Sequence, residues 1–343
     1  MRAIVFHRHG GLEVLEEAEI PTPEPGPGEV RVQVRAVALN HLDLWVRKGL
    51  PGLNLEMPHI LGSDIAGVVD KVGEKVEGLQ PGLEVMVQPG LSCGRCEACL
   101  TGHDNDCPSY RIIGEHVRGG YAEYVVVPAS NVVPKPPNLS FEEAAAIPLV
   151  FLTAWEMLVR KARVRPGERV LVQAAGSGVS SAAIQIAKLY GAEVIASAST
   201  EEKLQKAREL GADHTVNYTR QDLVAEVRRI AGSKRGVEVV VDHVGEATWE
   251  SSVRSLANGG RLVVCGATTG YDVRVDLRHL FYRRLELLGS TMGSKGDLHR
   301  IVRLVELGKL RPVVDRVLPL SEAREAHRLL AERKAFGKVV LRP

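Results

Sequence analysis

The sequence predicts an α/β protein in which an all-β unit is followed by a doubly wound parallel sheet. Its 343 residues, 45% of them hydrophobic and 25% charged, suffice for two domains with separate hydrophobic cores. Residues 1 to about 135 are rich in proline and glycine and carry short runs of alternating apolar residues. Beyond residue 140, apolar strand-like runs alternate with segments of helical period, the pattern of a parallel sheet covered on both faces.

The first part of the chain contains three runs that predict strands of an irregular all-β unit. These runs are VRVQVRAVAL (30–39), AGVVDKVG (66–73) and GGYAEYVVV (119–127). The turn-rich stretch KPPNLS follows them, and its Ser140 stands three residues before Glu143. This spacing is a capping box, so we expect a helix to begin there.

The second part predicts the strands and helices of a doubly wound sheet. Strands are expected at RVLVQAA (169–175), EVIASA (193–198), HTVNY (214–218), VEVVVDHV (237–244), RLVVCGA (261–267) and LELLGS (285–290), and helices at 181–190, 201–212, 220–231 and 248–260. A further helix is expected at 297–310, after which VVDRVLPL and GKVVL predict strands that return to the first domain. The expected domains are therefore 1–150 with 298–343, and 151–297.

Charge and hydropathy exclude two classes of partner. The 44 basic and 42 acidic residues are interspersed and leave a net charge of +2, so no broad field favours nucleic acid or an anionic membrane. The N-terminus lacks the apolar segment of a signal peptide, and no apolar run is long enough to span a bilayer. We expect a cytoplasmic protein.

Four of the five cysteines lie in one segment, SCGRCEACLTGHDNDC, and Cys265 stands apart from them. Disulfides are one alternative, but C-x2-C pairs would close strained small rings. Tetrahedral Zn2+ fits better, because short turns can aim four thiolates at one point. Four cysteine ligands leave no open coordination position, so we expect a structural zinc ion in the lobe 92–108 and chemistry elsewhere. The ligands would be Cys93, Cys96, Cys99 and Cys107.

A glycine-rich turn after the strand 169–175 predicts a dinucleotide site. The turn opens a helix, whose free N–H groups and dipole suit a pyrophosphate. An ordinary tight turn is the alternative, and the repeated strand–helix context favours the dinucleotide. Ser180 replaces the usual last glycine of the motif and is small enough to fit with some crowding. The expected pyrophosphate contacts are Gly176, Ser177, Gly178, Val179 and Ser180.

The end of the next strand favours NADP(H) over NAD(H). An NAD enzyme would place an acidic residue there to bind the ribose hydroxyls, but Ala198, Ser199 and Thr200 occupy the position. Without that carboxylate a 2′-phosphate is not repelled, and Ser199, Thr200 and Lys203 are able to bind it. A solvated surface charge is the alternative for Lys203, and Tyr218 is a weaker candidate for the same pocket.

These motifs together resemble the medium-chain dehydrogenase/reductase superfamily, which includes zinc alcohol dehydrogenases and quinone oxidoreductases. The resemblance covers nearly the whole chain and rests on LNHLDLWVRKG, PHILGSDIAGVVDKVG, the cysteine segment, GGYAEYVVVP, TAWEML, GSGVSSAAIQIAK and FGKVVL. It implies a GroES-like barrel for the first domain and a Rossmann fold for the second. The C-x2-C-x2-C-x7-C spacing matches the structural zinc lobe of that superfamily.

The resemblance also shows where the alcohol dehydrogenases keep the ligands of a catalytic zinc ion. In this sequence those positions carry Asn40, Ser63 and Leu149, and Asp64 replaces the glutamate that follows the second ligand. Asn, Ser and Leu do not supply the thiolate or imidazole donors of such a site. A zinc site rescued by His41, His59 and Asp64 remains an alternative. The pattern is more similar to the zinc-free quinone and enone reductases of the superfamily.

We therefore expect reduction of quinones or α,β-unsaturated carbonyl compounds by NADPH, because conjugation spreads the developing charge without a Lewis acid. Asn40 is expected to orient the substrate carbonyl, or alternatively to bond the backbone, with Ser63 and Asp64 as weaker catalytic candidates. The resemblance implies further cofactor contacts at Thr153, Val244, Cys265, Gly266, Ala267 and Lys338, the last reaching the pyrophosphate. The alternatives are a zinc-type alcohol dehydrogenase with unusual ligands and a non-catalytic NADPH-binding protein. A homo-oligomer, dimer or tetramer, is expected.

Overall fold

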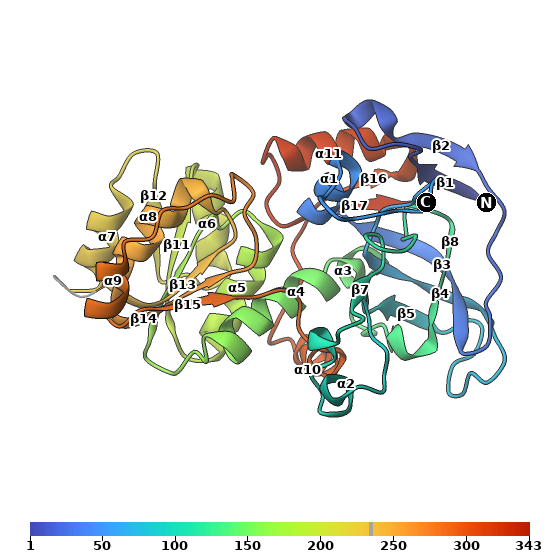
Figure 1. The fold of residues 1–343 in the computed structure, drawn as a ribbon, viewed down its shortest axis with the longest axis horizontal. Coiled ribbons are helices and arrows are strands. Elements are labelled where there is room, and N and C mark those ends of the chain that lie inside the picture. Colours follow the sequence, from blue (N-terminus) through green and yellow to red (C-terminus); the bar gives the residue numbers. More distant parts are fainter. Residues whose placement is uncertain (233–235) are drawn as a thin grey trace. The chain divides into compact units, whose positions relative to one another are not determined.

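A computed structural model describes residues 1–232 and 236–343 of the chain. Its residues form two compact units, Met1–Leu149 with Ser294–Pro343, and Val150–Gly293. The predicted α/β class is confirmed, since one unit is built around a largely antiparallel sheet and the other around a parallel sheet (Figure 1). No helix in the described parts of the chain is both long and apolar enough to cross a lipid bilayer.

The first unit contains a seven-stranded sheet in the order β16-β17-β3-β4-β5-β9, with β8 pairing to β3. The strands are β3 (Glu29–Ala38), β4 (Asp64–Val72), β5 (Glu84–Val87), β8 (Tyr124–Pro128), β9 (Val132–Pro134), β16 (Val314–Pro319) and β17 (Lys338–Arg342). Two small antiparallel sheets join β1 (Arg2–Val5) to β2 (Glu16–Glu19), and β6 (Gly90–Leu91) to β7 (Arg111–Ile112). The alternating apolar residues Val30, Val32 and Val34 of β3 are buried in the core, as period-2 patterning predicts.

The chain returns to the first sheet at its C-terminal end, as predicted. Strand β17 pairs antiparallel with the end of β3, where Val340 lies opposite Ala38, and β3 also pairs with the start of β4, where Ala38 lies opposite Asp64. The ends of three strands far apart in sequence therefore meet. Their junction brings Lys338 to the same place as Asn40 and Asp64.

Short helices connect these strands. They are α1 (His41–Lys48), α2 (Glu97–Leu100), α3 (Phe141–Ala145), α10 (Lys295–Glu306) and α11 (Ala323–Ala331), with 3-10 turns η1 (Leu12–Val14), η2 (Asp104–Asp106), η3 (Ala129–Asn131) and η5 (Leu320–Glu322). The capping box at the start of α3 is confirmed: Glu143 N donates to Ser140 Oγ at 3.2 Å, and Ser140 N donates to Glu143 Oε2 at 2.9 Å. The helix expected at 297–310 ends earlier, at Glu306, before Gly308 adopts a left-handed φ of 66°.

The second unit is a six-stranded parallel sheet in the order β12-β11-β10-β13-β14-β15. Its strands are β10 (Arg169–Val172), β11 (Glu193–Ala198), β12 (His214–Asn217), β13 (Val237–Asp242), β14 (Leu256–Val264) and β15 (Glu286–Gly289), and its helices are α5 (Gly178–Leu189), α6 (Glu201–Glu209), α7 (Leu223–Ile230), α8 (Glu246–Ser255) and α9 (Leu277–Tyr282). Helix α4 (Pro148–Trp155) and the π-helical segment η4 (Glu156–Lys161) precede β10.

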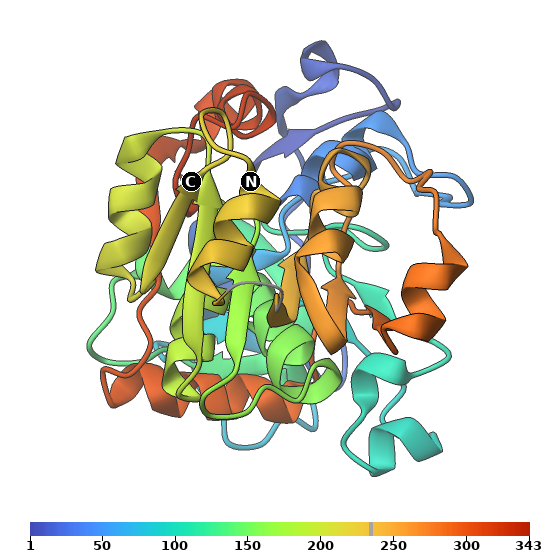
Figure 2. The same ribbon diagram turned by 90° about the vertical axis from the view of Figure 1, so that its left-hand side faces the viewer.

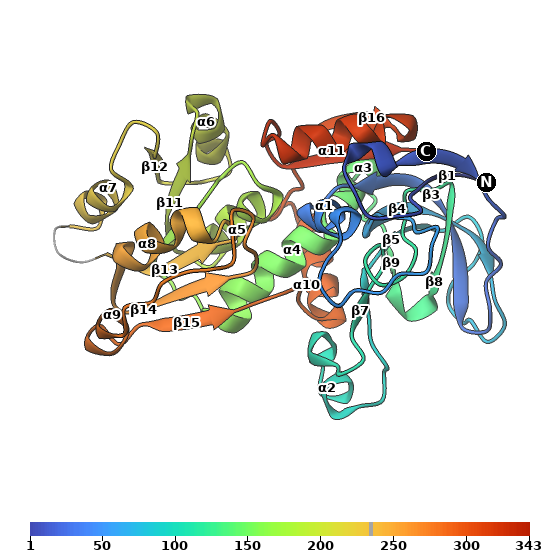
Figure 3. The same ribbon diagram turned by 45° about the horizontal axis from the view of Figure 1, so that its top comes forward.

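The parallel sheet is covered by helices, which explains its continuous apolar strands. The β13 residues Val239, Val240 and Val241 are fully buried, and helices pack around the sheet in Figures 2 and 3. The strand order reverses between β10 and β13. From β10 the chain adds β11 and β12 on one side of the sheet, and from β13 it adds β14 and β15 on the other side. Such a switch point opens a crevice at the carboxyl ends of the strands, where doubly wound sheets bind their ligands.

Candidate functional site

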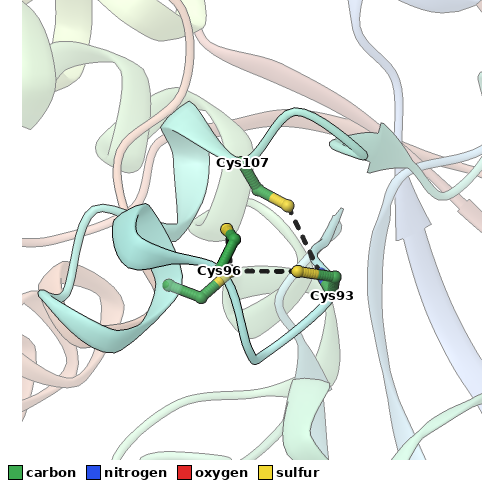
Figure 4. Close-up of side chains that lie close together, drawn as sticks. Cys93, Cys96 and Cys107 are labelled. Carbon is green, nitrogen blue, oxygen red and sulfur yellow. Dashed lines mark hydrogen bonds between the residues drawn. The ribbon is translucent and has the colours of Figure 1, made fainter.

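The four clustered cysteines converge on one point. Their sulfur atoms all lie within 4.8 Å of one another, and Figure 4 shows Cys93, Cys96 and Cys107 close together. The separation of the sulfur atoms is 3.9 Å for Cys93 and Cys99 and 3.4 Å for Cys96 and Cys99. Tetrahedral zinc with Zn–S bonds of about 2.3 Å requires sulfur atoms about 3.8 Å apart. The cluster therefore fits a structural zinc ion.

The cysteine lobe is anchored to the start of helix α10. Lys295 N donates to Asp104 Oδ1 at 3.0 Å, and Lys295 Nζ donates to Asn131 Oδ1 at 2.9 Å. Asp104 is nearly buried although it belongs to the lobe. The first bond ties the lobe to α10 and the second ties α10 to Asn131, so Lys295 links the lobe to the rest of the first unit.

The residues at the catalytic-zinc positions form a buried polar cluster around Asp64. Asp64 Oδ2 accepts from Asn40 Nδ2 at 2.9 Å and from Lys338 Nζ at 2.8 Å, while Asp64 Oδ1 accepts from Leu149 N at 2.7 Å. Lys338 Nζ also donates to Asn40 Oδ1 at 2.6 Å. The exposed fractions of Asn40, Asp64 and Lys338 are 6%, 0% and 3%. The Lys338 ammonium group thus balances the negative charge of Asp64 next to the positions where alcohol dehydrogenases keep the ligands of a catalytic zinc ion.

This arrangement limits the roles of the predicted residues. The second contact of Asn40 Nδ2 is Ala38 O at 3.5 Å, so both hydrogens of the amide face protein acceptors. The orientation of a substrate carbonyl by Asn40 stays a prediction. In the structure the Asn40 side chain is hydrogen-bonded to both Asp64 and Lys338. The Lys338 ammonium likewise has two protein partners, so its predicted contact with a pyrophosphate also stays a prediction.

Ser63 lies beside this cluster with an unused hydroxyl. Its side chain is fully buried, and its Oγ has no hydrogen-bond partner among the residues that the structure describes. A buried hydroxyl without a partner costs about 1–3 kcal/mol. The Ser63 hydroxyl therefore keeps an unused donor, and its predicted role toward a substrate stays a prediction.

His59, one of the two histidines proposed for a rescued zinc site, is engaged elsewhere. His59 Nε2 lies 3.2 Å from Gly114 O, and burial lowers the pKa of His59 to about 4, so the ring is neutral and donates to that carbonyl. Asp64 is already bonded to Lys338. Within residues 1–232 and 236–343, the four cysteines form the one group of three or more Cys, His, Asp or Glu side chains that is arranged to hold a metal.

The predicted dinucleotide turn is present between β10 and α5. Ser177 caps the helix by accepting from Ser180 N at 3.0 Å. The buried Ser180 hydroxyl donates to Gln173 O at 2.7 Å, which shows how serine occupies the usual glycine position. His243 Nε2 lies 2.8 Å from Ser177 Oγ, a contact that sequence reasoning missed. The turn therefore offers the free N–H groups of a helix N-terminus to an anion.

The residues predicted to bind a 2′-phosphate follow strands β11 and β12. Thr200 caps α6 by accepting from Lys203 N at 3.4 Å, and Ser199 O accepts from Thr219 Oγ1 at 3.4 Å. A methyl group added at Gly176 would lie 3.0 Å from Lys203 Cδ, so the lysine stem lies over the pyrophosphate turn. Tyr218 is 45% exposed. These side chains thus lie around the carboxyl end of β11, where Ala198, Ser199 and Thr200 stand in place of an acidic residue.

The residues expected near a nicotinamide follow the adjacent parallel strands β13 and β14. The buried Asp242 organises this edge, because its Oδ1 accepts from Val244 N at 2.7 Å and from Gly245 N at 3.2 Å. Cys265 N donates to Asp242 O at 3.3 Å, and Gly266 and Ala267 come next in the chain. Burial and the nearby Asp242 raise the pKa of Cys265 to about 12, so the thiol is not a nucleophile.

Comparison with known proteins decides the family. A model described as "Zinc-binding dehydrogenase" matches residues 178–306, and one described as "Alcohol dehydrogenase GroES-like domain" matches residues 26–137. A NAD-dependent alcohol dehydrogenase from Saccharolobus solfataricus is 36% identical over the full length of both chains. The chain belongs to the medium-chain dehydrogenase/reductase superfamily. The resemblance inferred from the sequence, including the GroES-like domain and the structural-zinc lobe, is thereby confirmed.

Other members of the superfamily differ in cofactor and substrate. A quinone oxidoreductase from Sus scrofa is 29% identical over 99% of this chain and 97% of its own. A solved structure of a NAD-dependent alcohol dehydrogenase is 61% identical with a TM-score of 0.97 over both whole chains. A crotonyl-CoA carboxylase/reductase in complex with NADP is 29% identical with a TM-score of 0.91, covering this chain entirely and 94% of its own. Membership therefore establishes an NAD(P)H-dependent oxidoreductase acting on small molecules.

Proposed function

We propose that this member of the superfamily uses NADP(H) to reduce quinones or α,β-unsaturated carbonyl compounds, with one structural zinc ion and no catalytic metal. The observation that carries the proposal is the Asn40–Asp64–Lys338 cluster, in which Asn40 occupies one of the three positions of the catalytic-zinc ligands. Asp64 is neutralised by an ammonium group, and Asn40, Ser63 and Leu149 offer no thiolate or imidazole. This set of donors is unsuited to zinc.

Without a catalytic metal, the reaction depends on how the protein positions the cofactor and the substrate, and on hydrogen-bond donors directed at the substrate oxygen. NADPH, when bound, supplies the hydride. The turn from Gly176 to Ser180 would hold the pyrophosphate, and Val244, Cys265, Gly266 and Ala267 with Thr153 would line the nicotinamide pocket. The Ser63 hydroxyl is a donor suited to the substrate oxygen as negative charge develops on it. Conjugated acceptors require less of this help than saturated ketones, because their own π-system spreads the charge.

The preference for NADPH is tested at Lys203. Ser199, Thr200 and Lys203 would bind a 2′-phosphate, so Lys203→Met should weaken NADPH binding by about 10- to 100-fold and leave NADH binding nearly unchanged. Lys206→Met is the matched control, because Lys206 lies on the same helix and pairs with Glu202 at 2.9 Å. Fluorescence titration measures both affinities. Equal affinity of the wild type for the two cofactors would refute the preference.

The substrate class is tested by following NADPH oxidation with quinones, enals, enones and saturated ketones, while the metal content is measured on the same sample. We expect about one zinc per chain and the fastest turnover with quinones or enones. The relatives named NAD-dependent alcohol dehydrogenases favour a second candidate, a zinc-type alcohol dehydrogenase. Two zinc ions per chain and preferential turnover of alcohols or saturated ketones would establish it. Tight NADPH binding without any turnover would instead identify a non-catalytic binding protein.

We also infer a homodimer formed through the edge of the parallel sheet. Strand β15 is the last strand of that sheet, and apolar side chains are exposed beside it, among them Leu277 at 64%, Phe281 at 60% and Tyr282 at 72%. A second copy that continued the sheet would cover these groups. Light scattering of Phe281→Glu tests the interface, and an unchanged oligomeric mass would refute it. A cytoplasmic location is proposed because zinc-binding thiols require reducing conditions.

A further inference from the structure

A buried polar network crosses the carboxyl ends of three neighbouring strands of the parallel sheet, β11, β10 and β13. Ser197, near the end of β11, donates from Oγ to Gln173 Oε1 at 2.7 Å. Gln173 directly follows β10 and donates from Nε2 to Ser252 Oγ of α8 at 3.0 Å. Ser252 Oγ donates in turn to Oδ2 of Asp242, the last residue of β13, at 2.6 Å. The network therefore spans the point where the strand order reverses.

The four side chains of this network are closed off from water. The exposed fractions of Ser197, Gln173, Ser252 and Asp242 are 0%, 1%, 0% and 2%. A buried polar group that loses its partner costs about 1–3 kcal/mol, whereas apolar side chains of the same shape would avoid that cost. Fully paired buried networks make the surrounding structure rigid and unique. The network thus indicates that the ends of these strands need one defined arrangement.

The chemistry of the groups sets the direction of each hydrogen bond. The Asp242 carboxylate only accepts, and it also receives two backbone N–H groups and Thr248 Oγ1, the last at 2.7 Å. The Ser252 proton is therefore directed at Asp242, so Ser252 Oγ accepts from Gln173. The Gln173 amide must then present Nε2 to Ser252 and Oε1 to Ser197. Only a side chain with a donor and an acceptor at its two ends completes this sequence.

Two members of the network are attached to segments that are predicted to bind phosphate groups. Ser197 stands two residues before Ser199, a predicted contact of the 2′-phosphate. Gln173 O accepts from Ser180 Oγ at 2.7 Å, so the same residue also holds the start of α5 behind the pyrophosphate turn. A change in the position of Gln173 would therefore reach both phosphate positions.

The third attachment is to the segment predicted to line the nicotinamide. Asp242 Oδ1 accepts from Val244 N at 2.7 Å and from Gly245 N at 3.2 Å. These two bonds fix the chain as it leaves β13, where Gly245 has a left-handed φ of 87°. One buried network thus joins the three segments that a bound dinucleotide would bridge.

We propose that Gln173 and Ser252 are positioning residues that hold the three cofactor segments in a fixed relative position, so that one NADPH molecule fits all of them at once. The inference rests on the proposed function, because that function assigns these segments to the cofactor. A ligand that touches one segment does not depend on their relative position. A whole dinucleotide does, because binding it requires that any freedom between the segments be removed.

The test is Gln173→Met, which keeps the length of the side chain and the backbone bond to Ser180 but removes both hydrogen bonds of the amide. We expect the Kd of NADPH to rise about 10-fold in titration calorimetry. The Kd of adenosine 2′,5′-bisphosphate, which lacks the nicotinamide half, should stay within about 2-fold of the wild-type value. Equal weakening of both ligands would mean local damage beside Ser197 and would overturn the inference.

Ser252→Ala breaks the network at a different bond and has a matched control. It should also raise the Kd of NADPH about 10-fold, and its combination with Gln173→Met should bind no more weakly than the weaker single variant, because both changes remove one shared connection. Additive losses in the double variant would contradict the proposal. Ser255→Ala is the control and should bind NADPH like the wild type, because Ser255 is equally buried on α8 and its Oγ has no hydrogen-bond partner among the described residues.

These titrations separate the inference from the proposed function, because they measure binding and not turnover. A wild type that bound NADH more tightly than NADPH, or that reduced no quinone or enone, would refute the proposed function. The same variants titrated with NADH and with adenosine 5′-monophosphate would then support the inference if only NADH binding weakened, and overturn it if both ligands weakened equally. A wild type that bound neither dinucleotide would overturn both.

Discussion

Replacing Lys338 by methionine tests whether the ammonium group, rather than a metal, balances the Asp64 charge. The Lys338 and Asp64 side chains are 3% and 0% exposed, with Nζ and Oδ2 2.8 Å apart. Removing one partner of a buried ion pair leaves an uncompensated charge and costs about 3–5 kcal/mol. In a unit of this size, each kcal/mol lowers the melting temperature by about 2–4 °C. The expected loss for Lys338→Met is therefore about 6–20 °C.

Calorimetry at pH 7.5 measures this loss, and two further variants identify its cause. Lys338→Met combined with Asp64→Asn buries no charge and should recover most of the lost stability, because a neutral pair costs less than a lone carboxylate. Lys71→Met breaks an exposed pair with Glu24, separated by 2.6 Å, and should cost less than about 1 kcal/mol. A melting temperature of Lys338→Met within about 3 °C of the wild type would refute the reasoning.

Three further outcomes follow from the structure. Chelation of the metal at the cysteine lobe, or Cys107→Ser, should lower the melting temperature of the first unit and leave NADPH affinity unchanged; a chelator without effect on melting would contradict the zinc assignment. Gly62→Ala should lower stability by about 2–5 kcal/mol in urea titrations, since its φ is +99° and its Cβ would meet Tyr121; a midpoint equal to that of the wild type would contradict this. Cys265, with a pKa of about 12, should resist iodoacetamide at pH 8 until the protein is unfolded, as peptide mapping by mass spectrometry would show.

Features that depend on neighbouring residues could be predicted from the sequence. The capping box at Ser140, the helix opened by Ser177 and the convergence of the four cysteines are all encoded within fifteen residues of chain. The parallel sheet could also be predicted, because its first four strands in the chain are apolar runs that are each followed by a segment of helical period; the helix expected at 248–260 ends at Ser255, directly before β14 begins. Local spacing decides such features, and tertiary contacts only confirm them.

Features that depend on distant pairs could not be predicted. Lys338 and Asp64 are 274 positions apart, and His327 and Tyr121 are 206 positions apart, so no spacing rule connects them. The resemblance predicts that Lys338 contacts the pyrophosphate. In the structure the Lys338 ammonium group is hydrogen-bonded to Asn40 and Asp64. One signal was available: Asp64 stands two residues before the apolar strand predicted at 66–73, and a buried carboxylate requires a cation.

The charge count at this cluster links the fold to the choice of substrate. Asp64 and Lys338 cancel, Asn40, Ser63 and Leu149 are neutral, and the nearby buried Asp43 already accepts from the Asn40 and Gly62 amides, so a Zn2+ ion placed among them would have no thiolate or imidazole ligand. The same neutrality leaves no strong positive field to stabilise a localised alkoxide. A hydroxyl at Ser63 and a conjugated acceptor provide weaker, distributed stabilisation, which suits quinones and enones better than simple ketones. The absence of thiolate and imidazole ligands and the proposed substrate class thus both agree with a balanced, buried ion pair at this place.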